Sequence, residues 1–303
     1  MDPLHLETLR AVHDRGGVTA AALVLRLTPS AVSQQLKALQ RVAGVPLTER
    51  VGRGLRLTPA GEALAASAVD VAVALRRAEA ACDAFLARPT GTVRLAAFQS
   101  GAQMLVPGLL TRLAADPGIT LQVADEDVAQ RDFPALTADA DVVVAHRPDR
   151  GHAWDPAVRV VPLLREPLDV ALPLGHRLAD RESVRPADLV EEGWIAVREG
   201  FPVAAVLAAI AADAGTVPRV VHRINDFHVV EALVAAGHGI SLLPRYTADD
   251  RGGTRFRMVP LAGIRAGREI DALARPDRAE RVVVRRVLDL LRAEAQAVVR
   301  AAR

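Results

Sequence analysis

The sequence predicts a helical N-terminal domain, one long connecting helix and a C-terminal α/β domain. Three observations lead to this prediction: apolar residues recur at helical spacing before residue 58, a heptad repeat follows them, and short apolar strands alternate with helices from Thr92 onward. The chain has 303 residues, of which 50% are hydrophobic, so it is long enough to bury more than one core.

Positive charge is concentrated at the N-terminus. Residues 1–58 carry eight basic and four acidic side chains, whereas the formal net charge of the whole chain is only +2. A basic first segment followed by a nearly neutral remainder predicts that nucleic acid is contacted by the first segment alone.

Composition also indicates where the protein works. The single cysteine, Cys82, excludes an internal disulfide and suits a reducing cytoplasm. The N-terminus lacks the apolar run of a signal peptide, and no apolar run is long enough to span a bilayer. We therefore expect a soluble, cytoplasmic protein without a membrane partner.

The first two expected helices form a small core. One side of the first helix carries Leu6, Leu9 and Val12, and this helix ends at the Gly16-Gly17 pair. A second short helix is expected from Thr19 to Leu25. Its small residues suited to close packing are Ala21, Ala22 and Val24.

The stretch from Thr28 to Arg41 is predicted to be a helix with two different faces. Thr28 can cap the first turn, and Pro29 suits the first helical position. One face is an apolar stripe of Val32, Leu36 and Leu39. The other face carries only hydrogen-bonding or basic side chains, namely Ser30, Ser33, Gln34, Lys37 and Arg41. A recognition helix presents such a face to a DNA major groove, although an ordinary amphipathic surface helix fits the same pattern.

Residues 47–58 are predicted to form a β-hairpin wing. Gly52 and Gly54 allow a tight turn between two short segments of alternating apolar residues. The arginines on this hairpin, which can reach phosphates or a minor groove, are Arg50, Arg53 and Arg56.

A heptad repeat predicts that the connecting helix pairs with another helix. Its apolar positions are spaced alternately by four and three residues, with no proline or charge among them. The most economical partner is the same helix of a second subunit, in which case Cys82 is a buried structural thiol. The positions of this seam are Leu64, Ala68, Val71, Leu75, Ala78, Cys82 and Phe85.

From Thr92 the pattern indicates an α/β domain with largely parallel sheets. Strands are expected at residues 93–98, 119–124, 142–145, 158–163, 168–173, 194–197, 220–224 and 240–243. Helices are expected at residues 104–114, 203–212, 228–236 and 281–299.

Residues 4–61 resemble the N-terminal domain of the LysR-type transcriptional regulators. The resemblance lies in the segments LTPSAVSQQLKALQ and GVPLTERVGRGLRLTPAGEAL. One departure is Thr48, where family members usually carry Phe. The resemblance implies a winged helix-turn-helix at residues 1–58, a linker and dimerisation helix at 59–88, and an effector-binding domain at 89–303 that is similar to periplasmic binding proteins.

The resemblance also implies partners and a two-lobed effector domain. Lobe I would comprise about residues 89–162 and 268–303, and lobe II about residues 163–267, with chain crossings near Val161–Leu163 and Ile264–Arg268. The implied partners are double-stranded operator DNA, a second copy in a homodimer that assembles to a tetramer, a small-molecule effector and RNA polymerase.

Site residues follow from matching the family pattern. DNA contacts are expected at Thr28, Ser30, Ser33, Gln34, Lys37, Arg50 and Arg53, with Gln34 suited to adenine and Lys37 to guanine or a phosphate. Effector contacts are expected at Phe98, Gln99, Ser100, Gly101, Arg198, Phe201, Pro202, Asp226 and Phe227.

The effector is expected to be a small, partly apolar anion. Ser100 begins a helix whose free N–H groups suit a carboxylate or phosphate, and Arg198 can neutralise that charge. Phe98, Phe201 and Phe227 all fall in loops at the expected cleft. The alternatives are that Ser100 only caps its helix and that each phenylalanine belongs to a core.

Catalysis is not expected. The sequence has no G-x-S-x-G elbow, P-loop or HExxH motif, and neither a catalytic residue, a metal site nor a cofactor is predicted. His238 fits a helix-to-strand turn, and His146 and His152 are expected to be solvated. The function predicted is therefore an effector-responsive transcriptional regulator. The alternatives are an architectural DNA-binding protein and an α/β enzyme fused to a helix-turn-helix.

Overall fold

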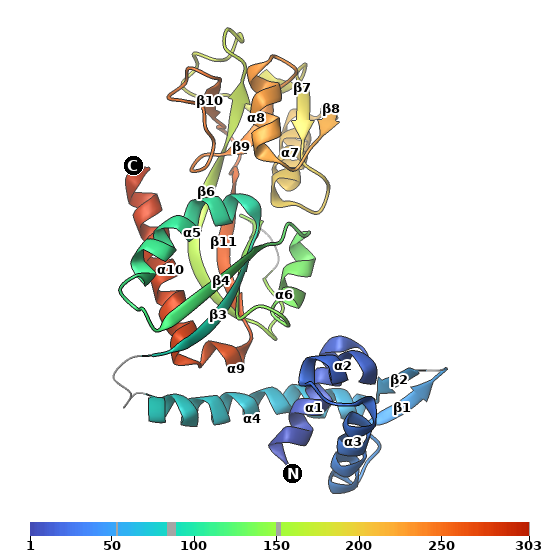
Figure 1. Cartoon of the computed structure of the whole chain (residues 1–303). Coiled ribbons are helices and arrows are strands. Elements are labelled where there is room, and N and C mark those ends of the chain that lie inside the picture. The colour runs from blue at the N-terminus through green and yellow to red at the C-terminus, as the bar shows by residue number, and fades with distance from the viewer. Residues whose placement is uncertain (53, 84–88, 150–152, 303) are drawn as a thin grey trace. The chain divides into compact units, whose positions relative to one another are not determined.

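A computed structural model describes residues 1–52, 54–83, 89–149 and 153–302 (Figure 1). The chain forms two compact units, one from Met1–Pro89 with Arg275–Val284 and one from Thr90–Ala274 with Arg285–Arg303. The predicted boundary between residues 58 and 59 thus lies inside the first unit. None of the described helices is both long enough and apolar enough to cross a bilayer.

Local capping sets the three helices that open the first unit. They are α1 (Pro3–Arg15), α2 (Val18–Leu25) and α3 (Pro29–Ala43). The Thr28 side chain caps α3 by accepting from the Ala31 N–H at 3.2 Å, and Pro29 occupies the first position as predicted. Gly44, at φ 73°, ends α3 in the left-handed conformation that glycine adopts without strain.

The apolar stripes of these helices meet in one core. Leu9, Val32 and Leu39 are completely buried in it, and the wing and α4 contribute further side chains. The prediction for Val24 is wrong, since its side chain is 49% exposed. The helix α2 is only two turns long and turns its small residues, Ala21 and Ala22, toward the core instead.

The wing is an antiparallel hairpin of β1 (Thr48–Val51) and β2 (Gly54–Leu57). Leu47, directly before it, is buried in the core of the first unit. The Leu47 carbonyl accepts from the Thr58 N–H at 3.0 Å, which brings the two ends of the hairpin together at the start of α4 (Pro59–Asp83). This closure fixes where the hairpin leaves the domain.

The heptad seam of α4 divides into a covered part and an open part. Leu64 and Ala68 pack into the core of the same chain. Val71, Leu75, Ala78 and Cys82 are exposed, and Phe85 lies outside the described residues. Cys82 is therefore not a buried thiol in the single chain, because the described residues of this chain do not supply the apolar partner that would cover it.

Lobe I of the second unit contains most of a mixed sheet. Its strands are β3 (Gly91–Ala97), β4 (Ile119–Asp125), β5 (Val142–Pro148) and β11 (Gly267–Ala274), joined to the long β6 (Arg159–Leu172). Its helices are α5 (Gln99–Leu113), α6 (Phe133–Leu136) and α10 (Val282–Ala301), with a 3-10 turn at Gln130–Asp132. A further short helix, α9 (Pro276–Ala279), precedes α10 and belongs to the first unit.

Lobe II is built on the second half of β6. This half pairs with β9 (Ser241–Pro244) and β10 (Arg257–Pro260). A smaller parallel pair, β7 (Gly193–Ala196) and β8 (Arg219–Arg223), lies with α7 (Pro202–Ala214), α8 (Phe227–Ala235) and a 3-10 turn at Pro186–Leu189. Trp194, 2% exposed, lies in the core of this lobe.

Two expectations about this domain are wrong. The sheets are mixed rather than largely parallel, because β6 pairs antiparallel with β9, β10 and β11. The strands expected at 158–163 and 168–173 are one continuous strand, and its pairing passes from lobe I to lobe II between Pro167 and Leu168. The polar residues Arg165 and Glu166 interrupt the apolar pattern without interrupting the strand.

Candidate nucleic-acid interface and ligand cleft

The exposed face of α3 presents a short row of donors. Gln34 and Lys37 are exposed, and the stripe below them is buried. The Thr28 and Ser30 hydroxyls bond to each other at 2.9 Å, and the Ser33 hydroxyl donates to the Pro29 carbonyl at 2.9 Å. The hydroxyls therefore shape the first turn, which leaves Gln34 and Lys37 as the side chains with most freedom to reach a ligand.

The wing arginines differ in their surroundings. Arg56 pairs with Glu49 across the hairpin at 2.8 Å, and this hydrogen bond raises the pKa of Arg56. Arg50 is exposed and has no acidic side chain within 4 Å among the residues described here, and Arg53 lies outside them. Of the two wing arginines that the structure describes, Arg50 is thus the more available to a phosphate.

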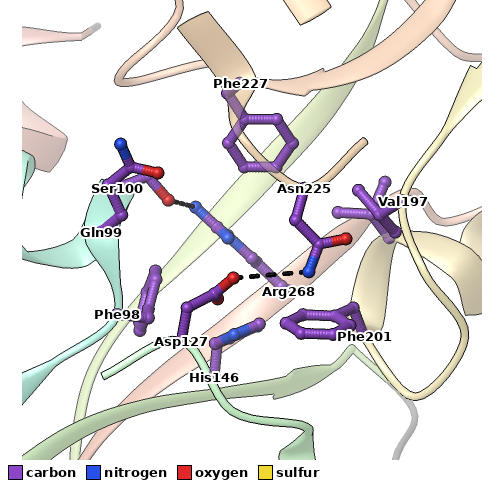
Figure 2. A pocket seen from close by; sticks show the side chains of 11 residues that line it. Phe98, Gln99, Ser100, Asp127, His146, Val197, Phe201, Asn225, Phe227 and Arg268 are labelled. Atoms are coloured by element: carbon purple, nitrogen blue, oxygen red, sulfur yellow. Dashed lines mark hydrogen bonds between the residues drawn. The ribbon is translucent and has the colours of Figure 1, made fainter. Parts of the chain in front are cut away.

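A narrow cleft lies between the two lobes of the second unit, with a closed cavity of about 20 Å³ inside about 350 Å³ of empty space that includes open solvent. Five residues expected from the sequence line it: Phe98, Gln99, Ser100, Phe201 and Phe227. Six lining residues were not anticipated: Asp127, His146, Val197, Val203, Asn225 and Arg268. Figure 2 shows these side chains converging from both lobes.

The other four expected effector contacts do not line the cleft. Arg198 is exposed, with its guanidinium carbon 5.7 Å from the Phe201 ring centre. Asp226 caps α8 by accepting from the His228 N–H at 2.9 Å, and Pro202 occupies the first position of α7. Gly101 lies so close to Phe98 that an added Cβ would be 2.6 Å from the Phe98 Cζ.

The arginine that lines the cleft is Arg268, whereas Arg198 was expected to neutralise the anion. Arg268 is 1% exposed, and its Nε and Nη2 donate to Glu166 Oε2 at 2.9 and 2.7 Å. Its Nη2 also donates to Ser100 Oγ at 2.8 Å, and its guanidinium carbon is 4.9 Å from the Phe98 ring centre. Arg268 on β11 and Glu166 on β6 face each other in register where the chain crosses between lobes.

His146, expected to be solvated, is buried at 3% exposure. The strand β5 continues through it, and its ring centre lies 4.3 Å from that of Phe98 and 5.2 Å from that of Phe133. Burial, with the nearby charge of Arg268, holds the pKa of His146 well below its ordinary value, so the imidazole is neutral. Neither ring nitrogen has a hydrogen-bond partner among the described residues. His152 lies outside these residues.

Hydrogen bonds join the lobes at the mouth of the cleft. The Asn225 Nδ2 donates to Asp127 Oδ2 at 3.3 Å, as drawn in Figure 2. Asn225 is held in turn by the Arg198 N–H, which donates to its Oδ1 at 2.9 Å. A backbone bond of 3.2 Å from the Gln130 N–H to the Gly200 carbonyl lies nearby. These contacts are polar and near solvent, so they can exchange with a ligand.

Two helices begin at the cleft without a side-chain cap. The N-cap residues of α5 and α7 are Phe98 and Phe201, whose rings offer no acceptor to the first-turn N–H groups. A helix N-terminus carries a partial positive charge and favours anions. Together with Arg268, these termini make the inner part of the cleft suited to a carboxylate.

We predict that His146 makes the stability of the chain depend on pH. The unfolded state protonates this imidazole near pH 6.5, whereas the folded state keeps it neutral. Stability is therefore expected to fall as the pH drops below 6.5, by up to about 1.4 kcal/mol per pH unit from this group. Urea unfolding at pH 7, 6 and 5 measures the slope, which His146→Leu should reduce. The exposed His238→Leu is the control, and an equal slope in both variants would contradict the prediction.

Among the described residues, no group of three or more His, Cys, Asp or Glu side chains is arranged to hold a metal ion. The polar groups of the cleft are a neutral imidazole, one arginine paired with a glutamate, a hydroxyl and an exposed carboxylate. These groups face the cleft, where they can form hydrogen bonds or ion pairs with a ligand.

Comparisons with known proteins cover nearly the whole chain. The family described as "Bacterial regulatory helix-turn-helix protein, lysR family" matches residues 4–62, and "LysR substrate binding domain" matches residues 86–296. The transcriptional regulator TtuA of Agrobacterium vitis is 32% identical over 260 residues, covering 80% of this chain and 84% of that protein. The regulator CbbR of Rhodospirillum rubrum is 30% identical over 252 residues, covering 81% of each.

Solved structures share the fold. A full-length OxyR variant from Pseudomonas aeruginosa matches with a TM-score of 0.68 at 20% identity, covering 96% of this chain and 95% of that one. Full-length CbnR in complex with its target DNA matches with a TM-score of 0.51 at 24% identity, covering 97% of this chain and all of that one.

Proposed function

The chain belongs to the LysR family of bacterial transcriptional regulators, and from that premise we propose how this member contacts DNA and what controls it. The DNA contact is made by α3 and the wing. The observation that carries this proposal is the exposed Gln34 and Lys37 on a helix whose opposite face, Val32, Leu36 and Leu39, is fully committed to the core. A helix anchored in this way can enter a major groove without losing its packing.

Each exposed side chain has a suitable DNA partner. Gln34 can pair with adenine through both atoms of its amide, and Lys37 can reach guanine or a phosphate. Thr28, Ser30 and Ser33 lie at the start of the same helix, where hydroxyls and N–H groups suit phosphates. Arg50 and Arg53 on the wing would contact the backbone beside them.

We propose that the protein acts as a homodimer paired through α4 and assembles to a tetramer. Val71 and Leu75 keep 37% and 46% of their surface exposed, at seam positions that the described residues of this chain cover only in part. Pairing two such helices buries these side chains and places two recognition helices on one DNA site.

The effector bound in the cleft is proposed to be a small anion. Support comes from Arg268 and from the uncapped starts of α5 and α7. Binding there changes the lobe geometry and, through the dimer, the bend of the DNA and the contact with RNA polymerase in the cytoplasm. Such control requires that the effector bind the two DNA-bound geometries with different affinity. We propose no catalytic role.

Substitutions on α3 test the DNA contact. If Gln34 reads a base, Gln34→Ala should weaken binding to the preferred site by about 1–3 kcal/mol and relax sequence preference at one position. If Lys37 contacts a phosphate, Lys37→Ala should weaken binding to all sequences and lower the salt slope by about 1. Affinities of the full chain for selected and scrambled duplexes, measured at several salt concentrations, separate these effects.

Two controls sharpen this experiment. Arg131→Ala removes a cation whose side chain is 88% exposed in the other compact unit, and should leave affinity unchanged. Lys37 is the only lysine of the chain, so an amine-reactive reagent that marks lysines reports on α3 directly, and DNA should protect this position. If neither α3 variant loses affinity and Lys37 stays reactive on DNA, the interface is misassigned.

A further inference from the structure

The cleft is lined by the carboxylate of Asp127, which would repel a ligand that carries only negative charge. We propose that its ligand is a small α-amino acid, with the carboxylate directed to Arg268 and the protonated amine directed to Asp127. This inference rests on the proposed function, since it names the class of ligand that the same cleft takes. An amino acid differs from a plain anion because it carries a positive and a negative group on the same molecule.

In the inner part of the cleft, the positive charge of Arg268 is shared with Glu166. Glu166, which is 0% exposed, already accepts two hydrogen bonds from Arg268, and Ser100 accepts a third. A carboxylate can still be held there by the remaining donor capacity of the guanidinium and by the uncapped N-termini of α5 and α7. Because Glu166 already balances the charge of Arg268, little positive charge remains for a second anionic group on the ligand.

The outer part is negative. Asp127 lines the cleft, is exposed, and has no basic side chain within 4 Å among the residues that the structure describes. Its hydrogen bond from Asn225, at 3.3 Å, is long and joins a neutral group to a charged one without supplying a cation. An anionic ligand would be repelled here, whereas an ammonium group would supply the missing positive charge.

The middle part is apolar except for one unsatisfied group. Phe201 and Val197 form walls, and His146 lies between them and Phe98 with both ring nitrogens unpartnered among the described residues. A buried polar group without a partner is costly, so these nitrogens favour a ligand that can hydrogen-bond to them. In this setting of the lobes the closed cavity is only about 20 Å³, room for about one water molecule, so an amino acid with a short side chain would enter only as the lobes move apart.

The amine would also link ligand binding to lobe geometry. Asp127 follows β4 in lobe I, and Asn225 follows β8 in lobe II. An ammonium group has three donors and can bond to oxygens of both residues. It would replace one long hydrogen bond between the lobes by two charge-assisted or polar ones, which favours one setting of the lobes.

Thermal unfolding of the full-length protein with each of the twenty L-amino acids tests the inference. We expect a subset with short side chains to raise Tm. For each of these, the deaminated carboxylic acid and the decarboxylated amine with the same side chain should bind at least tenfold more weakly by calorimetry, because each lacks one of the two charged groups.

Two variants assign the amine contact. Asp127→Asn removes the charge but keeps an oxygen that accepts from Asn225, so it should lower amino-acid affinity at least tenfold and abolish the preference over the deaminated acid. Glu126→Gln removes an equal charge from the neighbouring exposed residue, which does not line the cleft, and should change neither.

The outcomes distinguish this inference from the proposed function. If no amino acid raises Tm, or if the deaminated acid binds as well and Asp127→Asn has no effect, the inference is overturned. In the second case an anionic effector, and with it the proposed function, stands. Retained DNA binding by the α3 variants would overturn the proposed interface whatever the cleft binds.

Discussion

Replacing Arg268 with alanine is expected to destabilise the effector domain by about 3–5 kcal/mol, because it leaves a buried carboxylate without its partner. Glu166 is 0% exposed and its other oxygen, Oε1, has no hydrogen-bond partner among the described residues. The same substitution removes the donor to Ser100 and the cation beside the Phe98 ring. Chemical unfolding of the full chain, followed by tryptophan fluorescence from Trp154 and Trp194, measures the loss.

Two companion variants identify the cause. Arg265→Ala removes a half-exposed cation of the same segment, and its partner Asp149 keeps two hydrogen bonds from Arg165, so this change should cost much less. The double variant Glu166→Leu with Arg268→Met removes both charges and keeps the volume filled, so it should recover most of the lost stability. If Arg268→Ala costs no more than Arg265→Ala, the buried pair does not hold the cleft.

The second large effect is expected from Leu39→Ala in α3. Leu39 is completely buried under the recognition face, and its truncation leaves a cavity that should cost about 2–5 kcal/mol. DNA affinity should fall with the folded fraction, although no DNA-facing side chain is changed. Unfolding curves and duplex binding, measured on the same preparations at two temperatures, show whether the two losses track each other.

The matched control lies on the neighbouring helix. Leu23 in α2 has a side chain that is 78% exposed, and Leu23→Ala should change stability by less than about 0.5 kcal/mol. Equal effects of the two leucine substitutions would contradict the packing described for the N-terminal core. A loss of DNA binding by Leu39→Ala without any loss of stability would contradict the explanation that affinity falls because less of the protein is folded.

The N-terminal unit can be predicted well because its signals are local. The cap at Thr28, the proline after it and the stripe from Val32 to Leu39 lie within twelve residues of each other, and the turn of the wing needs only two glycines. Contacts of this kind depend on helical or strand period alone. The exposure of Val24 escapes this reasoning because a two-turn helix has too few residues for the pattern to show its buried side.

The cleft is only partly predictable because its chemistry is long-range. Phe98, Ser100, Phe201 and Phe227 are expected because the resemblance to the LysR family places effector contacts at particular strand ends and helix starts. Arg268, in contrast, lies 168 residues from Ser100 and on a strand, β11, that was not expected; the family resemblance implies only a chain crossing near its start. Its pairing with Glu166 depends on the register of β11 against β6, which no local pattern reveals.

His146 shows the same limit in another form. Valine and alanine residues before it indicate a buried strand, but the apolar pattern ends one residue before the imidazole, which suggests a polar loop there. A histidine that continues an apolar strand is as consistent with burial as with solvation, and only the packing of Phe98 and Phe133 around it decides.

Genomic footprinting of the full-length protein tests most directly the central claim that α3 and the wing read DNA as paired units. The predicted result is a small set of discrete protected sites, each with two half-sites about 10 bp or a multiple of that apart, and loss of this pattern in Lys37→Ala. Uniform protection along the DNA, or discrete sites that persist unchanged in both the Gln34→Ala and Lys37→Ala variants, would contradict it.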